Sequence, residues 1–149
     1  MIEIKPFKAD DMLYVISHGV LEVGLRSDPT DELRKIAKER EDSGKCITGW
    51  VDEEIVGVAG IDPIWEGVGD VWLMLTPAIY SNVKETYRCI KEGLQKLIED
   101  NNLRRVQSYG RVDFAPCHVL FKHLKFKVEG MAKKYSPDGV DCIMYAKVK

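Results

Sequence analysis

The sequence predicts an α+β fold, in which a mixed, mostly antiparallel sheet is flanked by helices. Three observations support this fold class. Short segments with alternating apolar and polar residues occur early, in the middle and near the end of the chain. Between Val83 and Ile98, apolar residues instead recur every three or four positions, which is typical of a helix. Turn-forming residues at Asp52–Glu54 and Ser136–Gly139 join neighbouring strands into hairpins. The 149 residues correspond to one domain, residues 1–149.

The first third of the chain predicts a strand and two helices. Residues 2–7 alternate apolar and polar side chains, and Pro6 marks a strand edge. Asp10 is a suitable cap for a helix that ends near Gly24. A second helix, around residues 30–42, is expected to start at Asp28-Pro29, because proline suits the first helical position.

The middle third predicts three strands and the longest helix. Residues 46–51 and 55–61 form a hairpin around an acidic turn. A loop that contains Gly67 and Gly69 leads to a third apolar run, residues 71–75. The helix from Val83 follows, and Asn82 with Glu85 resembles a capping box at its start.

The last third predicts a strand, a short helix and a closing hairpin. The strand covers residues 105–112 and the helix residues 114–124. The hairpin strands are residues 127–135 and 140–147. The resulting order is β-α-α-β-β-β-α-β-α-β-β.

Composition excludes several classes of protein. Hydrophobic residues make up 45% and charged residues 31%, which is typical of a globular domain and excludes disordered and coiled-coil chains. No apolar run reaches the roughly 18 residues of a membrane span, and the charged N-terminus does not resemble a signal peptide. A cytoplasmic protein without membrane contact is therefore expected. The widely spaced cysteines predict buried thiols, with no disulfide framework and no metal site; they are Cys46, Cys89, Cys117 and Cys142.

The net charge of −2 conceals a division between the two halves of the sequence. Residues 1–75 carry 8 basic and 16 acidic side chains, whereas residues 76–149 carry 14 basic and 8 acidic ones. This division fits a partner with separated charges, or two halves that attract one another. The sequence pI of about 5.9 argues against a dedicated nucleic-acid-binding protein.

Three segments resemble the GNAT superfamily of N-acetyltransferases, in the order and spacing of that family. Residues 71–77 are similar to the family's fourth strand with its trailing V-x-P. The helix from Val83 resembles the one that follows the pyrophosphate loop, and residues 117–126 resemble the segment A-x-x-L-Y-x-x-x-G-F. The resemblance covers essentially the whole chain. It implies acetyl-CoA as co-substrate and an amine acceptor, either a small molecule or a protein.

The resemblance also implies where acetyl-CoA binds. In the family, the pantetheine arm pairs with backbone groups of the fourth strand, and the diphosphate lies at the start of the next helix. The basic second half would then meet the anionic CoA, and the acidic first half a cationic acceptor. The corresponding cofactor-binding residues are Leu73, Met74, Leu75, Asn82, Lys84, Arg88, Phe121 and Lys122.

Two features of the family pattern are missing from this sequence, the glycine-rich phosphate loop and the tyrosine general acid. The glycine-rich phosphate loop is replaced by Tyr80, Val83 and Glu85, so a carboxylate stands where phosphates would bind. The family's tyrosine general acid corresponds to Phe121, which has no proton to donate. Residues 70–126 also resemble, more weakly, GNAT-like internal virion proteins of phages and prophages.

Transfer to an amine requires a base for the ammonium and an acid for the departing thiolate. Glu66 and Asp70 are the candidate bases, and Tyr109 is the candidate acid. The alternatives are solvated loop carboxylates and an aromatic side chain packed on the sheet.

The sequence and the resemblance therefore allow two alternative functions. The first is an acetyl-CoA-dependent N-acetyltransferase that works by direct attack in a ternary complex. The alternative is a non-catalytic GNAT-fold phage or prophage protein, located in the virion or binding other virion proteins. Either function is compatible with a homodimer.

Overall fold

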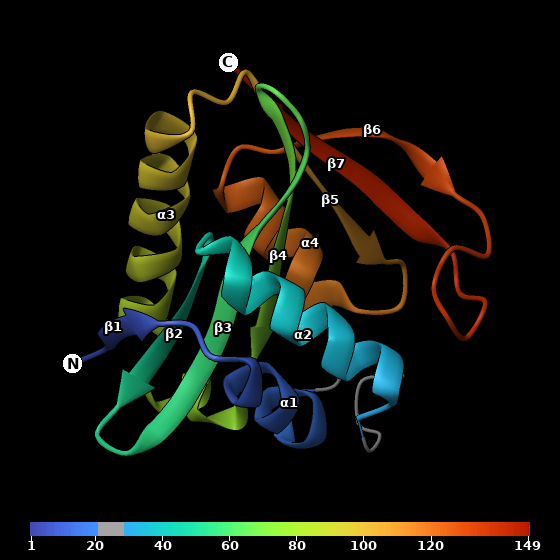
Figure 1. Cartoon of the computed structure of the whole chain (residues 1–149). Coiled ribbons are helices and arrows are strands. Elements are labelled where there is room, and N and C mark those ends of the chain that lie inside the picture. The colour runs from blue at the N-terminus through green and yellow to red at the C-terminus, as the bar shows by residue number, and fades with distance from the viewer. Residues whose placement is uncertain (21–28) are drawn as a thin grey trace. The chain divides into compact units, whose positions relative to one another are not determined.

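The computed structural model describes residues 1–20 and 29–149, in which the chain forms a single seven-stranded sheet (Figure 1). The strand order is β1-β2-β3-β4-β5-β7-β6. The pairs β1–β2, β2–β3, β5–β7 and β6–β7 are antiparallel, and β4–β5 is parallel. The expected element order and α+β class are confirmed. The elements are β1 (Glu3–Pro6), α1 (Ala9–His18), α2 (Asp31–Ser43), β2 (Cys46–Val51), β3 (Glu54–Trp65), β4 (Val68–Leu75), the 3-10 helix η1 (Pro77–Ser81), α3 (Val83–Asp100), β5 (Arg105–Arg111), α4 (Ala115–His123), β6 (Lys127–Ala132) and β7 (Cys142–Val148).

The chain divides into two compact units. The first contains Met1–Asp62 and Trp72–Gly93, and the second contains Pro63–Val71 and Leu94–Lys149. Strand β4 contributes its first residues to the second unit and its last residues to the first.

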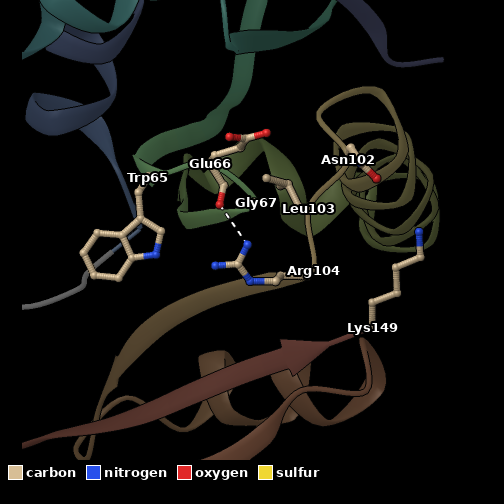
Figure 2. Close-up of a pocket in the computed structure, with 7 residues that line it drawn as sticks. All are labelled: Trp65, Glu66, Gly67, Asn102, Leu103, Arg104 and Lys149. Carbon is tan, nitrogen blue, oxygen red and sulfur yellow. Dashed lines mark hydrogen bonds between the residues drawn. The ribbon is translucent and has the colours of Figure 1, made fainter.

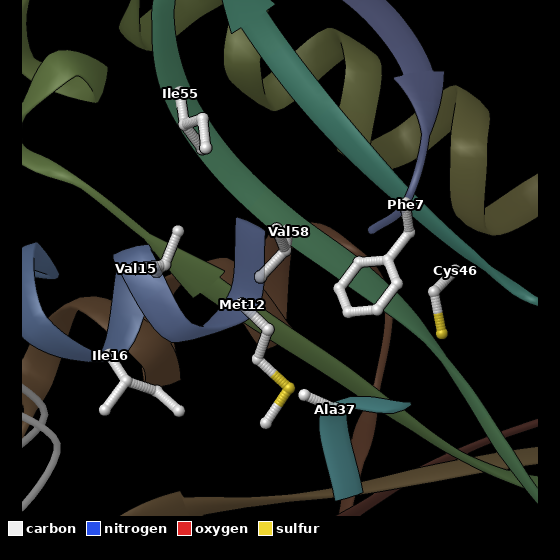
Figure 3. Close-up of a cluster of buried hydrophobic side chains, with 8 residues drawn as sticks. All are labelled: Phe7, Met12, Val15, Ile16, Ala37, Cys46, Ile55 and Val58. Atoms are coloured by element: carbon white, nitrogen blue, oxygen red, sulfur yellow. The ribbon is translucent and has the colours of Figure 1, made fainter. Parts of the chain in front are cut away.

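The core of the first unit lies where α1 and α2 pack on β2 and β3 (Figure 3). Met12 and Ile16 are buried on α1, as their spacing in the sequence predicts, and Val15 is buried beside them. Ala37 is fully buried on α2 and Val58 on β3. Figure 3 shows these side chains converging with Phe7, Cys46 and Ile55.

The ends of the two helices correct the sequence-based expectation. The cap of α1 is Lys8 rather than Asp10, because the Asp11 carboxylate accepts a bond from the Lys8 N–H at 3.0 Å. Gly24 and Asp28 lie outside the described residues. Helix α2 is capped by Thr30, whose hydroxyl accepts from the Leu33 N–H at 3.2 Å, so Pro29 precedes the cap.

Two loops differ in length from the sequence-based prediction: the one between β3 and β4 is shorter, and the one between β6 and β7 is longer. Strands β3 and β4 are joined by Glu66 and Gly67 alone, and Gly69 belongs to β4, where it pairs with Val106. Gly67 takes the positive φ of +80° that this turn requires. Between β6 and β7, the pairing ends earlier than expected, because Ser136 closes a separate turn with Val140 through backbone and hydroxyl bonds.

The second unit has α4 on one face of β5 and β7. A Cβ atom at Gly110 would lie 2.9 Å from Cys117 Sγ and 3.2 Å from the Phe121 ring, so the helix approaches the strand closely at this glycine. On β7, the Tyr145 ring stacks on Phe121 with 4.3 Å between centroids. Helix α4 therefore covers the face of the strands from which the side chain of Tyr145 projects.

Candidate active site

Two tyrosines stack on the opposite face of the second unit. The rings of Tyr109, on β5, and Tyr135, in the turn after β6, lie 4.4 Å apart at 13°. Asp70 on β4 is aligned with Gln107 in the parallel register, and Gln107 lies two residues before Tyr109 on the same strand face. The structure thus brings Asp70 and Tyr109 to one face, together with Tyr135, which the sequence analysis did not single out. We call Asp70, Tyr109 and Tyr135 the tyrosine–aspartate cluster.

The electrostatics of this cluster favour a protonated phenol. Burial raises the pKa of Tyr135, and neighbouring Tyr109 and Asp70 raise it further, because nearby negative charge disfavours a phenolate. The Oδ1 atom of Asp70 is buried. At neutral pH the cluster therefore offers a tyrosine hydroxyl as a proton or hydrogen-bond donor.

A buried arginine holds the turn that carries Tyr135. Arg111 is 7% exposed and donates to both carboxylate oxygens of Asp138, at 2.6 and 2.9 Å. It also donates to both oxygens of Asp113, at 3.0 and 3.1 Å. The hydrogen bonds from Arg111 are the main reason that the pKa of the Asp138 carboxyl lies well below its usual range. This bidentate ion pair fixes the β6–β7 turn against the end of β5.

Glu66, the other candidate base, lies in a different part of the second unit. It lines a cavity of about 470 Å³ with Trp65, Gly67, Asn102, Leu103, Arg104 and Lys149 (Figure 2). The Arg104 guanidinium donates to the Glu66 carbonyl at 3.0 Å. Arg104 precedes Tyr109 by five residues along an extended chain, or about 16 Å at the usual rise per residue. Glu66 therefore lies apart from Tyr109, the candidate acid.

In the first unit, the backbone of β4 distinguishes among the three predicted pantetheine-binding residues. The Thr76 N–H donates to the Val56 carbonyl on β3 at 2.9 Å. Backbone groups alternate between the two edges of a strand, so those of Met74 also face β3. A Cβ atom at Gly57 on β3 would lie 2.7 Å from the Met74 oxygen, in agreement with this direction.

The other two residues direct their backbone groups to the opposite edge of β4. The Leu75 carbonyl accepts a bond from the Val20 N–H at 2.7 Å and is therefore already engaged. By the same alternation, the amide and carbonyl of Leu73 lie on this edge. Leu73 is thus the predicted residue whose position best fits pairing with an extended ligand.

At the start of α3, the side chains of Asn82 and Glu85 already bind other groups of the protein. The Glu85 carboxylate accepts from the Ile2 N–H at 2.8 Å and lies 3.6 Å from Arg88, which also approaches Glu92 at 3.8 Å. Asn82 donates its side-chain amide to the Ala78 carbonyl at 3.0 Å. The Asn82 N–H donates to the Ile79 carbonyl at 2.9 Å, so Asn82 and Glu85 bond to other groups and the expected capping box does not form. Of the predicted phosphate-binding residues, Lys84 is exposed on the first turn of α3.

The two predicted residues on α4 differ in their surroundings. Phe121 packs between the rings of Phe126 and Tyr145, so it belongs to an aromatic cluster on the helix-covered face. Lys122 is exposed in the last turn. His118 binds the Arg111 carbonyl through Nε2 and the Tyr145 hydroxyl through Nδ1, each at 2.6 Å. Because a carbonyl only accepts, Nε2 carries a proton and donates it to the Arg111 carbonyl. His118 thus packs α4 against the sheet.

Metal ligands, membrane-spanning helices and cysteines can each be compared with the expectations from the sequence. Within 1–20 and 29–149, no three His, Cys, Asp or Glu side chains gather closely enough to hold a metal ion. No helix of this part of the chain has the length and apolar character needed to cross a membrane. Cys46 and Cys142 are buried, as expected for thiols, whereas Cys89 and Cys117 are partly exposed.

The fold is that of the GNAT acetyltransferases. An acetyltransferase of the GNAT family from Bacillus anthracis matches with a TM-score of 0.74 and 18% identity, over 99% of this chain and 94% of that one. Ard1 from Thermoplasma volcanium matches with a TM-score of 0.76 and 16% identity, over 99% and 97% of the two chains. Ribosomal-protein-alanine N-acetyltransferase from Brucella melitensis matches with a TM-score of 0.76 and 13% identity, over 99% of each chain.

These matches confirm the fold that the resemblance predicts. They cover the whole chain at low sequence identity. No protein-family model matches the sequence, and no curated protein matches it.

Proposed function

We propose that this protein is an acetyl-CoA-dependent N-acetyltransferase. The observation that carries the proposal is the match of nearly the whole chain to GNAT acetyltransferases. The tyrosine–aspartate cluster adds support, because its carboxylate and two phenol rings lie on one face of the second unit. Such a pair supplies the base and the acid that amine acylation needs.

In this mechanism, Asp70 accepts a proton from the acceptor ammonium. Acetyl-CoA supplies an acetyl thioester, and the free amine attacks its carbonyl carbon. The new C–N bond forms as the C–S bond breaks, and Tyr109 or water donates a proton to the departing thiolate. The newly bonded nitrogen passes its second proton to solvent, and Asp70 and Tyr109 then return to their starting protonation states by exchange with solvent, so one proton is released for each amide formed.

The first unit offers groups that suit acetyl-CoA. The Leu73 amide and carbonyl lie on the edge of β4 that faces away from β3, where an extended pantetheine amide can pair. The N–H groups at the start of α3 and the exposed Lys84 suit a diphosphate. Arg88 contributes less, because Glu85 and Glu92 already surround it. The residues present therefore fit this co-substrate without a glycine-rich loop.

The first test is release of free CoA from acetyl-CoA with a panel of primary amines. We expect turnover with at least one amine, and a rise in unfolding temperature when acetyl-CoA is added alone. Neither turnover nor a thermal shift at saturating acetyl-CoA would contradict the proposal and leave the non-catalytic GNAT-fold protein as the alternative.

The second test addresses the base. Asp70→Asn is expected to lower kcat by about 10²- to 10⁴-fold, as for loss of a general base. Glu53→Gln, in the exposed turn between β2 and β3, is the matched control and should leave kcat unchanged. A comparable loss in Glu66→Gln but not in Asp70→Asn would assign the base to the cavity of Figure 2 instead.

A further inference from the structure

We propose that the exposed ring of Tyr135 and the carboxylate of Asp70 together recognise the acceptor as a primary alkylammonium ion. The inference rests on the proposed function in one respect: it takes the ligand of the tyrosine–aspartate cluster to be the acetyl acceptor. It adds a recognition residue that the sequence does not point to.

The tyrosine–aspartate cluster lies on a face of the second unit that helix α4 does not cover. The Arg105 Nε donates to Gln107 at 2.9 Å, which shows that alternate residues of β5 project to the same side as Tyr109. Gly110 projects to the other side, against Cys117 and Phe121 of α4. The tyrosine–aspartate cluster is therefore on the face opposite α4.

The ring of Tyr135 is only partly covered by the protein. One face of the ring stacks on Tyr109, yet the residue remains 55% exposed. An aromatic face carries negative potential and attracts a cation that lies over it. Tyr135 is also held in place, because the Lys134 N–H donates to Asp141 at 2.8 Å on one side and Arg111 binds Asp138 on the other. The exposed ring face is thus a fixed surface.

Acidic groups outnumber the basic groups around the cluster on β5. Arg105 binds the Glu129 carboxylate and is also attracted by Asp70, and Arg111 binds the carboxylates of Asp113 and Asp138. The cluster itself contributes the Asp70 carboxylate and the negative faces of the tyrosine rings. An ammonium ion with N–H donors complements this arrangement, whereas a carboxylate or phosphate ligand would be repelled.

Hexane-1,6-diamine binding in the absence of acetyl-CoA tests the inference independently of catalysis. We expect it to bind the wild-type protein and hexane-1,6-diol to bind much more weakly. Tyr135→Ala and Asp70→Asn should each weaken diamine binding by about fivefold or more, whereas Tyr135→Phe, which keeps the ring, should lose less. Tyr14→Ala is the matched control, because Tyr14 is a similarly exposed tyrosine stacked on His18 of α1 in the first unit.

The outcomes separate the inference from the proposed function. Diamine binding that depends on Tyr135 supports the inference even if no acetyl transfer is found. Acetyl transfer whose amine KM is the same in Tyr135→Ala and wild type overturns the inference while the function stands. Equal binding of diamine and diol, or no diamine binding to a wild-type protein that is folded by circular dichroism, also overturns it.

Discussion

At the scale of single residues, close backbone approach is the strictest requirement in the first unit. A Cβ atom at Gly57 would lie 2.6 Å from Leu75 Cδ2 and 2.7 Å from the Met74 oxygen. The latter is a backbone atom of the neighbouring strand and cannot rotate away. The smallest side chain is therefore needed at this point of β3, beside the part of β4 that is proposed to bind acetyl-CoA.

Gly57→Ala is accordingly expected to destabilise the protein by about 1–3 kcal/mol, as overpacked sites do. For a chain of this size, each kcal/mol lowers the melting temperature by about 2–4 °C. Gly93→Ala is the control, because its Cβ would meet nothing within 4 Å and alanine favours the interior of α3. Thermal unfolding of the two variants gives the comparison, and equal melting temperatures would contradict the close approach.

At the scale of elements, β1 and α3 are joined by the Glu85 carboxylate. The sequence predicts that this carboxylate repels a diphosphate at the helix start. In the structure it also accepts the Ile2 N–H bond at 2.8 Å, and its side chain is 24% exposed. Removing the whole side chain would therefore change the anchoring of β1 and the charge of the helix start together.

Glu85→Gln separates the two effects, since the amide oxygen can still accept from Ile2. If the diphosphate lies at the start of α3, this variant should bind acetyl-CoA about fivefold more tightly at low salt, equivalent to about 1 kcal/mol of lost repulsion. The gain should shrink at high salt because the charges are screened. Calorimetric titration at both salt concentrations measures it; unchanged affinity at low salt would place the diphosphate elsewhere.

The turn between β6 and β7 predicts a dependence on pH. The pKa of the Asp138 carboxyl is lowered by Arg111, so its stabilising contribution is complete above the unfolded pKa of about 3.9 and is lost as the pH falls towards the depressed folded pKa. Asp138→Asn should therefore lower the melting temperature at pH 7, and the difference from wild type should narrow below about pH 4. Thermal unfolding across this range tests the expectation.

Asp42→Asn is the control for this pH series, because Asp42 forms an exposed pair with Lys38 on α2 and such pairs contribute little. A difference between Asp138→Asn and wild type that stays constant down to acid pH would show that the ion pair with Arg111 is not its source.

The elements also show what the sequence can and cannot predict. Cys46–Val51 is a strand with the predicted bounds, because β-branched and apolar residues there are followed by a turn. The prediction that Asp10 caps α1 was wrong. Asp11 binds the start of the helix instead, and it is held there by Thr48, a residue 37 positions away whose hydroxyl donates to the Asp11 carboxylate at 2.7 Å. Tyr135 was not predicted for a similar reason. Its turn is held by the ion pair between Arg111 and Asp138, and a local sequence pattern does not predict an ion pair between residues 27 positions apart. Asp70 and Tyr109 were candidates, but their shared face follows from the β4–β5 register.

At the scale of the whole molecule, strands β3 and β4 and helix α3 each contribute residues to both compact units. The residues of β4 up to Val71 belong to the second unit and those from Trp72 to the first. Each unit also contains one buried and one partly exposed cysteine: Cys46 and Cys89 in the first, Cys142 and Cys117 in the second. Burial raises the pKa of the Cys46 thiol, which further slows its reaction with thiol reagents.

Cysteine labelling therefore reports the opening of each unit separately. In the native protein we expect Cys89 and Cys117 to react first, and Cys46 and Cys142 to be protected. Because neither unit retains an intact β4 when the other unfolds, Cys46 and Cys142 should become reactive at the same urea concentration, as in a two-state transition. Mass spectrometry of peptides labelled along a urea series measures both midpoints. A lower midpoint for Cys142 would mean that the unit carrying the tyrosine–aspartate cluster unfolds on its own, and that β4 does not couple the two units.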